Sequence, residues 1–211
     1  MTALSNAIAQ LRIDLADQDP AAYRWTDAQL TEHINHALAD LSVEIPFEIG
    51  NKLSATPGSR AISIATLVPR VRIVTVEYPT GEYPPIFVNF SVWADVLTML
   101  IDSAPSTAAD VQVSWQTHHT LAATTTLDAA QLQLLLTGAA GYAAAQLASG
   151  KAEAISIGGP NTDKDYASMS VRLLRDFRAV LKRKGERGRL HQRRLYAPAE
   201  PAATQETDPG P

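Results

Sequence analysis

Cysteine is absent from this chain of 211 residues, which excludes disulfide frameworks, thiol nucleophiles and thiolate metal sites. Apolar runs of about 18 or more residues are absent too, so we expect no membrane-spanning helix. The opening stretch MTALSNAIAQLRIDLAD lacks the basic segment of a signal peptide, and we expect synthesis in the cytoplasm. An apolar content of 45% still indicates a globular protein with a real core.

Few residue patterns in the sequence carry enzymatic chemistry. His33 and His36 stand three residues apart on one expected helix, but the zincin spacing HExxH is absent. His118 and His119 are adjacent near an expected strand end, where neighbouring side chains point to opposite faces. We therefore favour surface or interface roles for these histidines over a metal site.

The segment QLASGKAE has some likeness to a phosphate-binding loop. That motif requires a glycine five residues before Gly150, where this chain has Ala145, and a hydroxyl residue after Lys151, where it has Ala152. A helix C-cap accounts for Gly150 instead. Since no nucleophile elbow, paired carboxylates or metal spacing supports catalysis, we expect no enzymatic activity, cofactor or metal.

Positive charge is concentrated near the C-terminal end of the chain. Residues 172–194 hold ten basic and two acidic residues, a net charge of +8, while the rest of the chain carries −12. Such a split suggests that one end of the chain meets something acidic. The basic residues are Arg172, Arg175, Arg178, Lys182, Arg183, Lys184, Arg187, Arg189, Arg193 and Arg194.

The segment 24–46 carries the clearest helix signals. Thr26 is a suitable N-cap, and Gln29 three residues later completes a capping box. Trp25 before the cap can pack on Leu30 as a hydrophobic staple. Pro46 ends the helix because the residue before a proline avoids the helical region. The apolar stripe at helical spacing is Leu30, Ile34, Ala37, Leu38, Leu41 and Ile45.

Three further helices are expected. An earlier apolar stripe predicts a first helix that ends near Asp17, and a second capping box at Asp128 predicts a helix over 129–149. The glycines and alanines of that helix make it thin, so a neighbour can approach closely. Asn161 or Thr162 then caps a fourth helix. The stripe residues are Leu4, Ile8, Leu11 and Leu15 in the first helix and Leu173, Leu174, Phe177, Val180 and Leu181 in the fourth.

Between residues 47 and 126 the apolar period falls to two, which is typical of strands with one core face. One strand is expected at 71–78, and the turn PTGEYPP allows a hairpin to residues 86–92. In another strand Val111, Val113 and Trp115 face the core, and Gln112, Ser114 and Gln116 face water. For residues 93–101 we favour a short helical turn over a strand.

The expected fold class is α+β, a four-helix bundle with an inserted antiparallel β domain and an extended C-terminal tail. Residues 1–46 and 127–185 would form the bundle, and residues 47–126 the inserted domain. Residues 186–211 would form a C-terminal arm, because the final stretch is rich in proline, alanine and acidic residues.

The stretch YRWTDAQLTEHINHALADLSVEIP resembles the second helix of head–tail connector (adaptor) proteins of tailed bacteriophages. In that family a W-[ST]-D-x-x-L start precedes an I-N-x-A helix. VRIVTVEYPTGEYPPIF, ADVQVSWQTHHTL and GAAGYAAAQLA resemble stretches of the β-containing members encoded near portal genes. The resemblance covers roughly residues 1–185 and depends on the order of these segments. The matching positions of the first motif are Trp25, Thr26, Asp27, Leu30, Ile34, Asn35 and Ala37.

The resemblance implies a structural protein of the virion neck, without enzymatic activity. Such adaptors form a ring, usually of twelve copies, beneath the portal at the capsid vertex, where they extend the DNA channel and dock the tail. Genomic DNA passes through without sequence-specific binding, and no membrane is involved. Their C-terminal segments reach into the portal. The residues expected to bind the portal here are Arg183, Arg187, Arg189, Leu190, Arg193, Arg194, Leu195 and Tyr196.

Three alternatives remain open from the sequence. The chain could be a stopper or tail-completion protein of the same neck region, one ring further from the capsid. It could also be a nucleic-acid-binding module that uses the basic fourth helix as a clamp, which a steep salt dependence of DNA binding would reveal. An enzyme with an unrecognised site is the third alternative.

Overall fold

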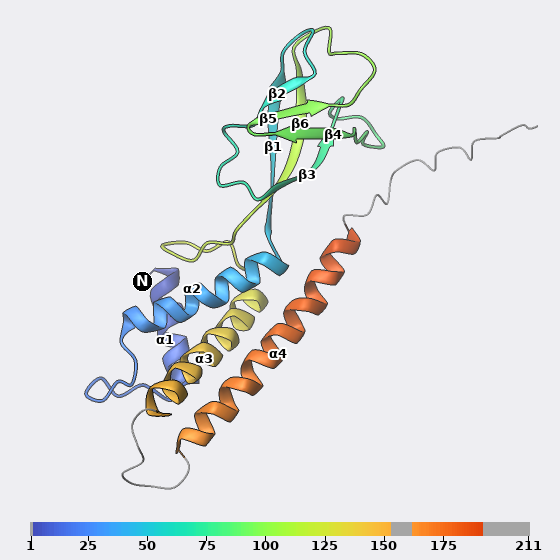
Figure 1. The fold of residues 1–211 in the computed structure, drawn as a ribbon. Helices are drawn as coiled ribbons and strands as arrows, with labels where there is room; N and C mark the ends of the chain where they lie inside the picture. The colour runs from blue at the N-terminus through green and yellow to red at the C-terminus, as the bar shows by residue number, and fades with distance from the viewer. Residues whose placement is uncertain (1, 153–161, 192–211) are drawn as a thin grey trace, which may run out of the picture. The chain divides into compact units, whose positions relative to one another are not determined.

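A computed structural model describes residues 2–152 and 162–191 of the chain, and the remaining residues are not considered (Figure 1). The fold is α+β, with four helices and two small antiparallel sheets in the described part, as the helical and alternating patterns indicated. The elements are α1 Ala3–Asp14, α2 Asp27–Glu44, β1 Phe47–Ala55, β2 Ala61–Ser63, β3 Arg72–Glu77, β4 Phe90–Trp93, β5 Val96–Met99, β6 Ala109–Thr117, α3 Ala129–Ala152 and α4 Thr162–His191.

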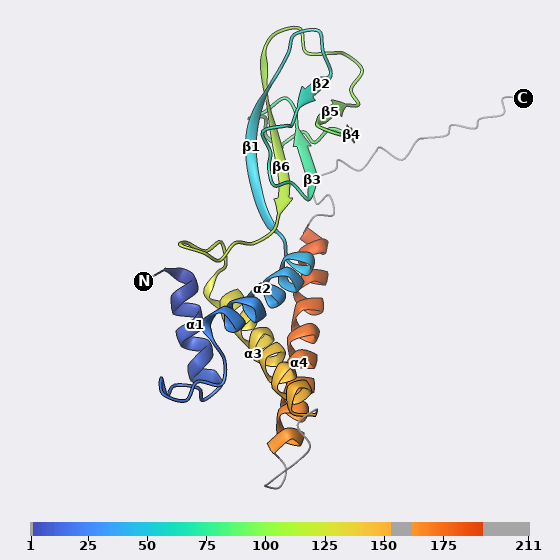
Figure 2. The same ribbon diagram turned by 60° about the vertical axis from the view of Figure 1, so that its left-hand side comes forward.

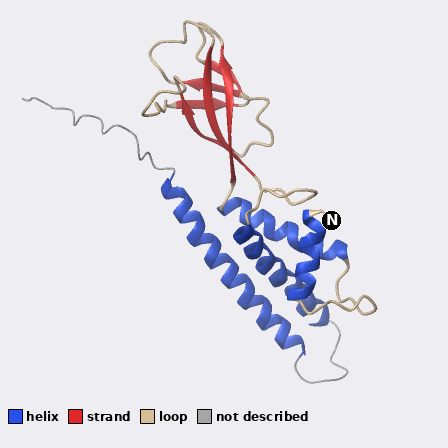
Figure 3. Ribbon diagram, turned by 180° about the vertical axis from the view of Figure 1, so that it is seen from behind, coloured by secondary structure: helices blue, strands red, loops and turns tan. Residues whose placement is uncertain are grey.

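The described chain divides into two compact units. Of the described residues, the helical unit comprises 2–47, 117–152 and 162–188, and the second unit comprises Glu48–Gln116 with 189–191. We call Glu48–Gln116 the β unit. Each unit has its own hydrophobic core of buried side chains. Leu121, in the connection before α3, packs in the core of the helical unit. Figure 3 distinguishes the helices of the one unit from the strands of the other.

Helix α1 ends three residues before the expected position, because the chain turns at Ala16. The amide of Ala16 donates to the carbonyl of Ile13 at 3.0 Å, and the amide of Asp17 donates to that of Arg12 at 2.8 Å. This pair of bonds is a Schellman motif, which places its turn residue in the left-handed region. Ala16 has a φ of 51° there, a conformation that glycine adopts without strain.

We therefore expect Ala16→Gly to stabilise the helical unit by about 1 kcal/mol, because it removes the left-handed strain of a Cβ atom. Chemical denaturation of the full chain, with hydrogen exchange of α1 as the local readout, measures the change. Ala9→Gly is the matched control, since it lies on the exposed face of α1 and should destabilise by about 1 kcal/mol. Destabilisation by both variants would contradict the account of the turn.

The starts of α2 and α3 confirm both predicted capping boxes. The Thr26 hydroxyl accepts from the amide of Gln29 at 3.2 Å, and the Gln29 side chain accepts from the amide of Thr26 at 2.8 Å. Asp128 and Gln131 repeat the exchange at 2.7 and 2.9 Å. The predicted staple pair is buried in one core, and the Nε1 of Trp25 also donates to the carbonyl of Ala143 on α3. Two local motifs thus fix where the packed helices begin.

The prediction that Gly150 caps the third helix is wrong, since α3 continues to Ala152. The predicted close approach at this helix is confirmed. A Cβ atom on Gly138 would lie 2.8 Å from the ring of Phe177, and one on Gly141 would lie 2.8 Å from Leu174. Both partners belong to α4, which runs beside α3 in Figure 1. The two glycines therefore form the surface on which α4 packs.

The β unit contains the two sheets, with strand orders β1-β6-β3 and β2-β5-β4. Strand β6 has the predicted alternation on its core face, where Val111, Val113 and Trp115 are buried. The prediction that Gln116 faces water is wrong, because its amide donates to Glu48 at 2.8 Å and its carbonyl oxygen accepts from Arg72 at 2.7 Å. These two partners compensate the burial of a polar side chain.

The helical turn predicted for residues 93–101 is also wrong. Trp93 ends β4, and Val96–Met99 forms β5, which pairs antiparallel with both β4 and β2. In β5 Leu97 and Met99 are buried, so the apolar residues follow the period of a strand. Four residues are too few for sequence periodicity to distinguish the two structures, and pairing on both edges decides for the strand.

The predicted hairpin between residues 71–78 and 86–92 is only partly present. Tyr78 donates from its amide to the carbonyl of Ile86 at 3.0 Å, and Val88 donates to that of Val76 at 2.9 Å. Beyond this short pairing the chain leaves the first sheet, since Phe90–Trp93 pairs with β5 in the second. A single expected strand is therefore divided between two sheets.

Candidate functional site

The exposed face of α4 is rich in basic side chains. Arg172, Arg175, Ala179, Lys182 and Glu186 are all exposed and follow one another at helical spacing, which places them in one stripe. Arg178 and Arg183 are exposed beside the stripe. We call Arg172, Arg175, Lys182 and Arg183 the cationic face. It extends for about 16 Å along the helix, at 1.5 Å per residue.

Acidic neighbours neutralise the cationic face only in part. Arg175 lies 3.2 Å from Asp176, but 72% and 55% of the two side chains are exposed, so the pair is weak. Between residues 166 and 186 of α4, six basic and two acidic residues leave a net charge of +4. This positive charge must be balanced by solvent ions or by an acidic partner.

Contacts from the other helices hold α4 in place. Gly185 packs against the backbone of Glu44 at the end of α2, where a Cβ atom would come within 2.8 Å of the carbonyl oxygen. Arg24 hydrogen-bonds the hydroxyl of Tyr166 near the start of α4. Tyr142 of α3 donates to Asp40 of α2 and is also hydrogen-bonded by Arg178. The cationic face therefore stands on a helix that is fixed at several points.

Burial raises the pKa of Tyr142, and its hydrogen bond to Asp40 raises it further, while Arg178 acts in the opposite direction. The phenol is thus protonated at neutral pH and works as a hydrogen-bond donor. His36 packs edge-on against the Tyr142 ring, with 5.7 Å between ring centroids. These contacts connect α2, α3 and α4 and explain the polar residues at their junction without a catalytic role.

The structure places one residue of the predicted portal-binding set on a described surface. Arg183 is exposed on the cationic face. Arg187, Arg189 and Leu190 belong to α4, which continues to His191, so an arm that begins at residue 186 starts with helix. The side chains of these three are not among those described. Arg193, Arg194, Leu195 and Tyr196 lie outside the described residues.

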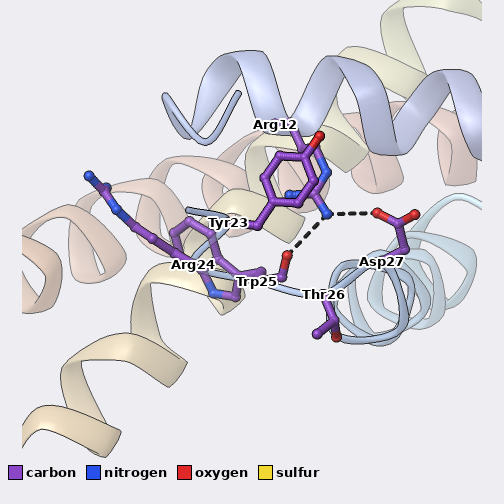
Figure 4. A pocket seen from close by; sticks show the side chains of 6 residues that line it. All are labelled: Arg12, Tyr23, Arg24, Trp25, Thr26 and Asp27. Carbon is purple, nitrogen blue, oxygen red and sulfur yellow. Dashed lines mark hydrogen bonds and ion pairs between the residues drawn. The ribbon is translucent and has the colours of Figure 1, made fainter. Parts of the chain in front are cut away.

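A second polar cluster joins the end of α1 to the start of α2 (Figure 4). The buried guanidinium of Arg12 donates to Asp17 at 2.7 Å, to Asp27 at 2.6 Å and to the carbonyl of Trp25 at 3.0 Å. The ring of Tyr23 covers the guanidinium at 3.6 Å. Asp17 also accepts from the amide of Arg24 at 2.8 Å. Arg12 therefore holds the α1–α2 loop closed.

Sequence reasoning missed this cluster. Its members lie within 16 residues of one another, but only the turn at Ala16 brings them together. Trp25 and Thr26 complete the lining of a pocket of about 290 Å³ around Arg12. Because Arg12 donates three hydrogen bonds within the chain, the cluster is best explained as a structural clamp.

The exposed surface beside this clamp is acidic. Asp14 at the end of α1 and Asp19 in the loop are exposed, and Asp27 exposes 74% of its side chain although it pairs with Arg12. Two large apolar side chains, Ile13 and Tyr23, are about half exposed here. We call Ile13, Asp14, Asp19, Tyr23 and Asp27 the acidic end.

The two histidines of α2 have different surroundings. His33 is buried, and its Nε2 lies 2.9 Å from the Oε1 of Gln146 on α3. His36 is exposed, and its Nε2 lies 3.3 Å from Glu32. Within the described residues no cluster of three or more potential metal ligands occurs. The interface role favoured for the pair from sequence fits these contacts.

The neighbouring residues His118 and His119 point to different surroundings, as their place at the end of β6 indicated. His118 is exposed, while His119 is buried, with Nδ1 3.0 Å from the hydroxyl of Thr126. Burial lowers the pKa of His119, and the backbone of Ile45 and Thr126 and the charge of Asp128 oppose that shift. His119 is therefore neutral in the folded protein at pH 7.

This pKa difference predicts a pH dependence. As the pH falls, His119 of the unfolded chain takes up a proton near pH 6.5, and His119 of the folded protein does so only at a lower pH. Between these two pH values, acidification therefore lowers the free energy of unfolding. His119→Gln should make the measured dependence of unfolding on pH less steep in this window. His118→Gln, at the exposed neighbour, should leave the slope unchanged. Equal slopes in His119→Gln and the wild-type chain would contradict the assignment.

The β unit has an exposed apolar surface that the sequence did not reveal. Trp93 is 87% exposed and lies directly opposite Val96 in the β4–β5 pair. Val71 and Val92 line a neighbouring pocket, which Arg70 borders while bound to Asp95 at 3.0 Å. In the structure Trp93 and Val96 pair across two strands, in place of the helical turn predicted for residues 93–101.

None of the helices, within the described residues, combines the length and apolar character needed to cross a membrane. The chain matches no protein-family model and no curated protein sequence.

Proposed function

We propose that this chain is a structural protein of the tailed-phage virion, a head-to-tail adaptor that forms a ring beneath the portal. The ring, of twelve copies, would extend the DNA channel and give the tail its docking surface in the neck. In this proposal the helical unit is a four-helix bundle, the β unit is its insert, and the protein is not an enzyme. Assembly partners are further copies, the portal protein and tail or neck proteins.

The observation that carries the proposal is the role of the motif at the start of α2. Thr26 caps the helix, and Trp25, Leu30, Ile34 and Ala37 are buried in the core. Residues of the motif that resembles the adaptor family thus cap α2 and build the core of the helical unit. This agrees with a resemblance that reflects a shared fold. The same residues show no arrangement of general acid, base or nucleophile.

The C-terminal arm is the proposed contact with the portal. Helix α4 directs the chain past Glu186, and Arg187, Arg189, Arg193 and Arg194 would pair with acidic groups of the portal. Leu190, Leu195 and Tyr196 would supply the apolar anchors. The segment 187–196 thus contains both basic side chains for ion pairs and apolar side chains for anchoring contacts.

The test is binding of the purified chain to the portal protein encoded in the same genome. We expect the full chain to bind, and a chain that ends at residue 191 to lose binding while its thermal unfolding stays unchanged. Arg187→Glu combined with Arg189→Glu should weaken binding as well. Unchanged binding of the shortened chain would remove residues 192–211 from the proposed contact, and a full chain that ignores the portal would contradict the adaptor function.

A second candidate is nucleic-acid binding by α4, which the exposed charge of the cationic face favours. Contacts of several arginines and lysines with phosphates would make DNA affinity fall steeply with salt. A stopper or tail-completion protein of the same neck would bind a tail protein, whereas an adaptor would bind the portal. Binding to a tail protein and not to the portal would therefore identify the stopper or tail-completion role.

A further inference from the structure

The cationic face and the acidic end have opposite charge and belong to different sides of the helical unit. Figure 2 shows α1 and α4 separated by α2 and α3, and Figure 3 shows the same order from behind. Apart from α4, the described helical unit up to Ser149 contains eight acidic and two basic residues, a net charge of −6. Residues 166–186 of α4 carry +4.

Each surface is neutralised only in part within the described chain, since Asp27 pairs with Arg12 and Arg175 pairs with Asp176. Asp14 accepts from the side chain of Gln10 at 3.2 Å, and Asp19 accepts from the amide of Ala21 at 3.0 Å, but both partners are neutral. Of the two basic residues nearby, Arg12 is buried in the clamp, and Arg24 is exposed and hydrogen-bonds the neutral Tyr166. On α4, Arg175 has only its exposed neighbour Asp176.

Apolar residues accompany the charges on both surfaces. Val171 is 68% exposed next to Arg172, and Arg175 follows it one helical turn later. On the other surface Ile13, 52% exposed, stands next to Asp14. Protein–protein interfaces combine exposed apolar side chains with charged ones. Here the charges of the two surfaces have opposite sign, which is the complementarity that association requires.

We propose that the cationic face of one copy docks on the acidic end of a second copy of this chain. Because the two surfaces are different and lie on different sides, the contact is head-to-tail. Such a contact leaves one free surface of each kind at the ends, so copies continue to add until a ring closes. The contact thus supplies the subunit interface of the proposed adaptor ring, and in that respect it rests on the proposed function.

A charge-swap experiment on the full chain, in the absence of portal, tests this contact. One variant reverses the cationic face with Arg172→Glu and Arg175→Glu, and the other reverses the acidic end with Asp14→Lys and Asp19→Lys. Self-association is measured by sedimentation at low salt, where interactions between surface charges are strongest. Circular dichroism verifies that each variant is folded. We expect all variants to fold, because the substituted positions are exposed.

We expect the wild-type chain to associate and each variant alone to associate about 100-fold more weakly, since like charges then meet. An equal mixture of the two variants should associate to within about threefold of the wild type, because each reversed surface meets its complement. Lys52→Glu, at an exposed position of the β unit, is the control for a change in net charge and should leave association intact.

Three results would overturn the inference: a wild-type chain that stays a single copy, variants that associate as the wild type does, or a mixture that fails to recover. If the Arg172→Glu and Arg175→Glu variant loses affinity for duplex DNA but self-associates normally, the cationic face is a nucleic-acid surface and the inference is wrong. The adaptor function is judged separately by portal binding, so its failure and that of this contact can be told apart.

Discussion

Arg12→Ala should lower the free energy of unfolding of the helical unit by about 3 to 5 kcal/mol, the usual effect of leaving a buried charge without its partner. Asp17 exposes 2% of its side chain, and its strongest partner is the guanidinium of Arg12. Removal of Arg12 also leaves the carbonyl of Trp25 without this donor. Denaturant unfolding, with hydrogen exchange over α1 and α2, measures the loss.

Asp27→Asn is the matched control for the Arg12 prediction. Asp27 also pairs with Arg12, but 74% of its side chain is exposed, so the change should cost less than about 1 kcal/mol. The double variant Arg12→Ala and Asp17→Ala should be less destabilised than the sum of the two single variants. A loss below about 1 kcal/mol for Arg12→Ala would show that the clamp does not hold the loop.

Phe177→Ala should cost about 3 to 5 kcal/mol, because it removes the largest buried side chain by which α4 packs on α3. The phenyl ring is fully buried and fills the space above Gly138. Without it, α4 keeps its short contacts at Gly141 and Gly185 but loses most of its apolar anchor. Hydrogen exchange of α4 should rise more than that of α1.

Gly138→Ala tests the same contact from the other helix. In the wild-type chain the new methyl group would lie 2.8 Å from the Phe177 ring, and crowding of this kind costs about 1 to 3 kcal/mol. In the Phe177→Ala background the crowding is gone, and alanine is a better helix former than glycine by about 1 kcal/mol. The substitution should therefore change sign from destabilising to stabilising between the two backgrounds, and the same sign in both would contradict the packing.

Local motifs explain which parts of the fold could be predicted from the sequence. The capping boxes at Thr26 and Asp128 involve residues three positions apart, so the starts of α2 and α3 follow from the sequence. The close approach at Gly138 was also predictable, because small residues at helical spacing leave room for a neighbour. The charge of α4 is likewise a property of the sequence itself.

The features that escaped prediction depend on contacts between distant segments. Gln116 is buried because Glu48 and Arg72 come from other strands to pair with it. Residues 96–99 form a strand because two other strands flank them. The clamp around Arg12 is the exception, because it depends on a local turn at Ala16, where alanine adopts a conformation that sequence patterns assign to glycine. The first two outcomes are tertiary and the third is a backbone conformation, so periodicity could not reveal them.

The two surfaces of the helical unit give the proposed ring a physical basis. An acidic end and a cationic face on one rigid unit favour association of different surfaces, whereas a two-fold dimer requires one self-complementary surface. The basic residues at the end of α4 would then extend the same charge towards the portal.

Electron microscopy of the full chain mixed with the portal protein of the same genome tests the central claim most directly. The account predicts a ring of copies of this chain, coaxial with the portal, in which the helical units of neighbouring copies meet through α4 and the α1–α2 end. Portal particles without added density, beside a protein that remains a single copy, would contradict it.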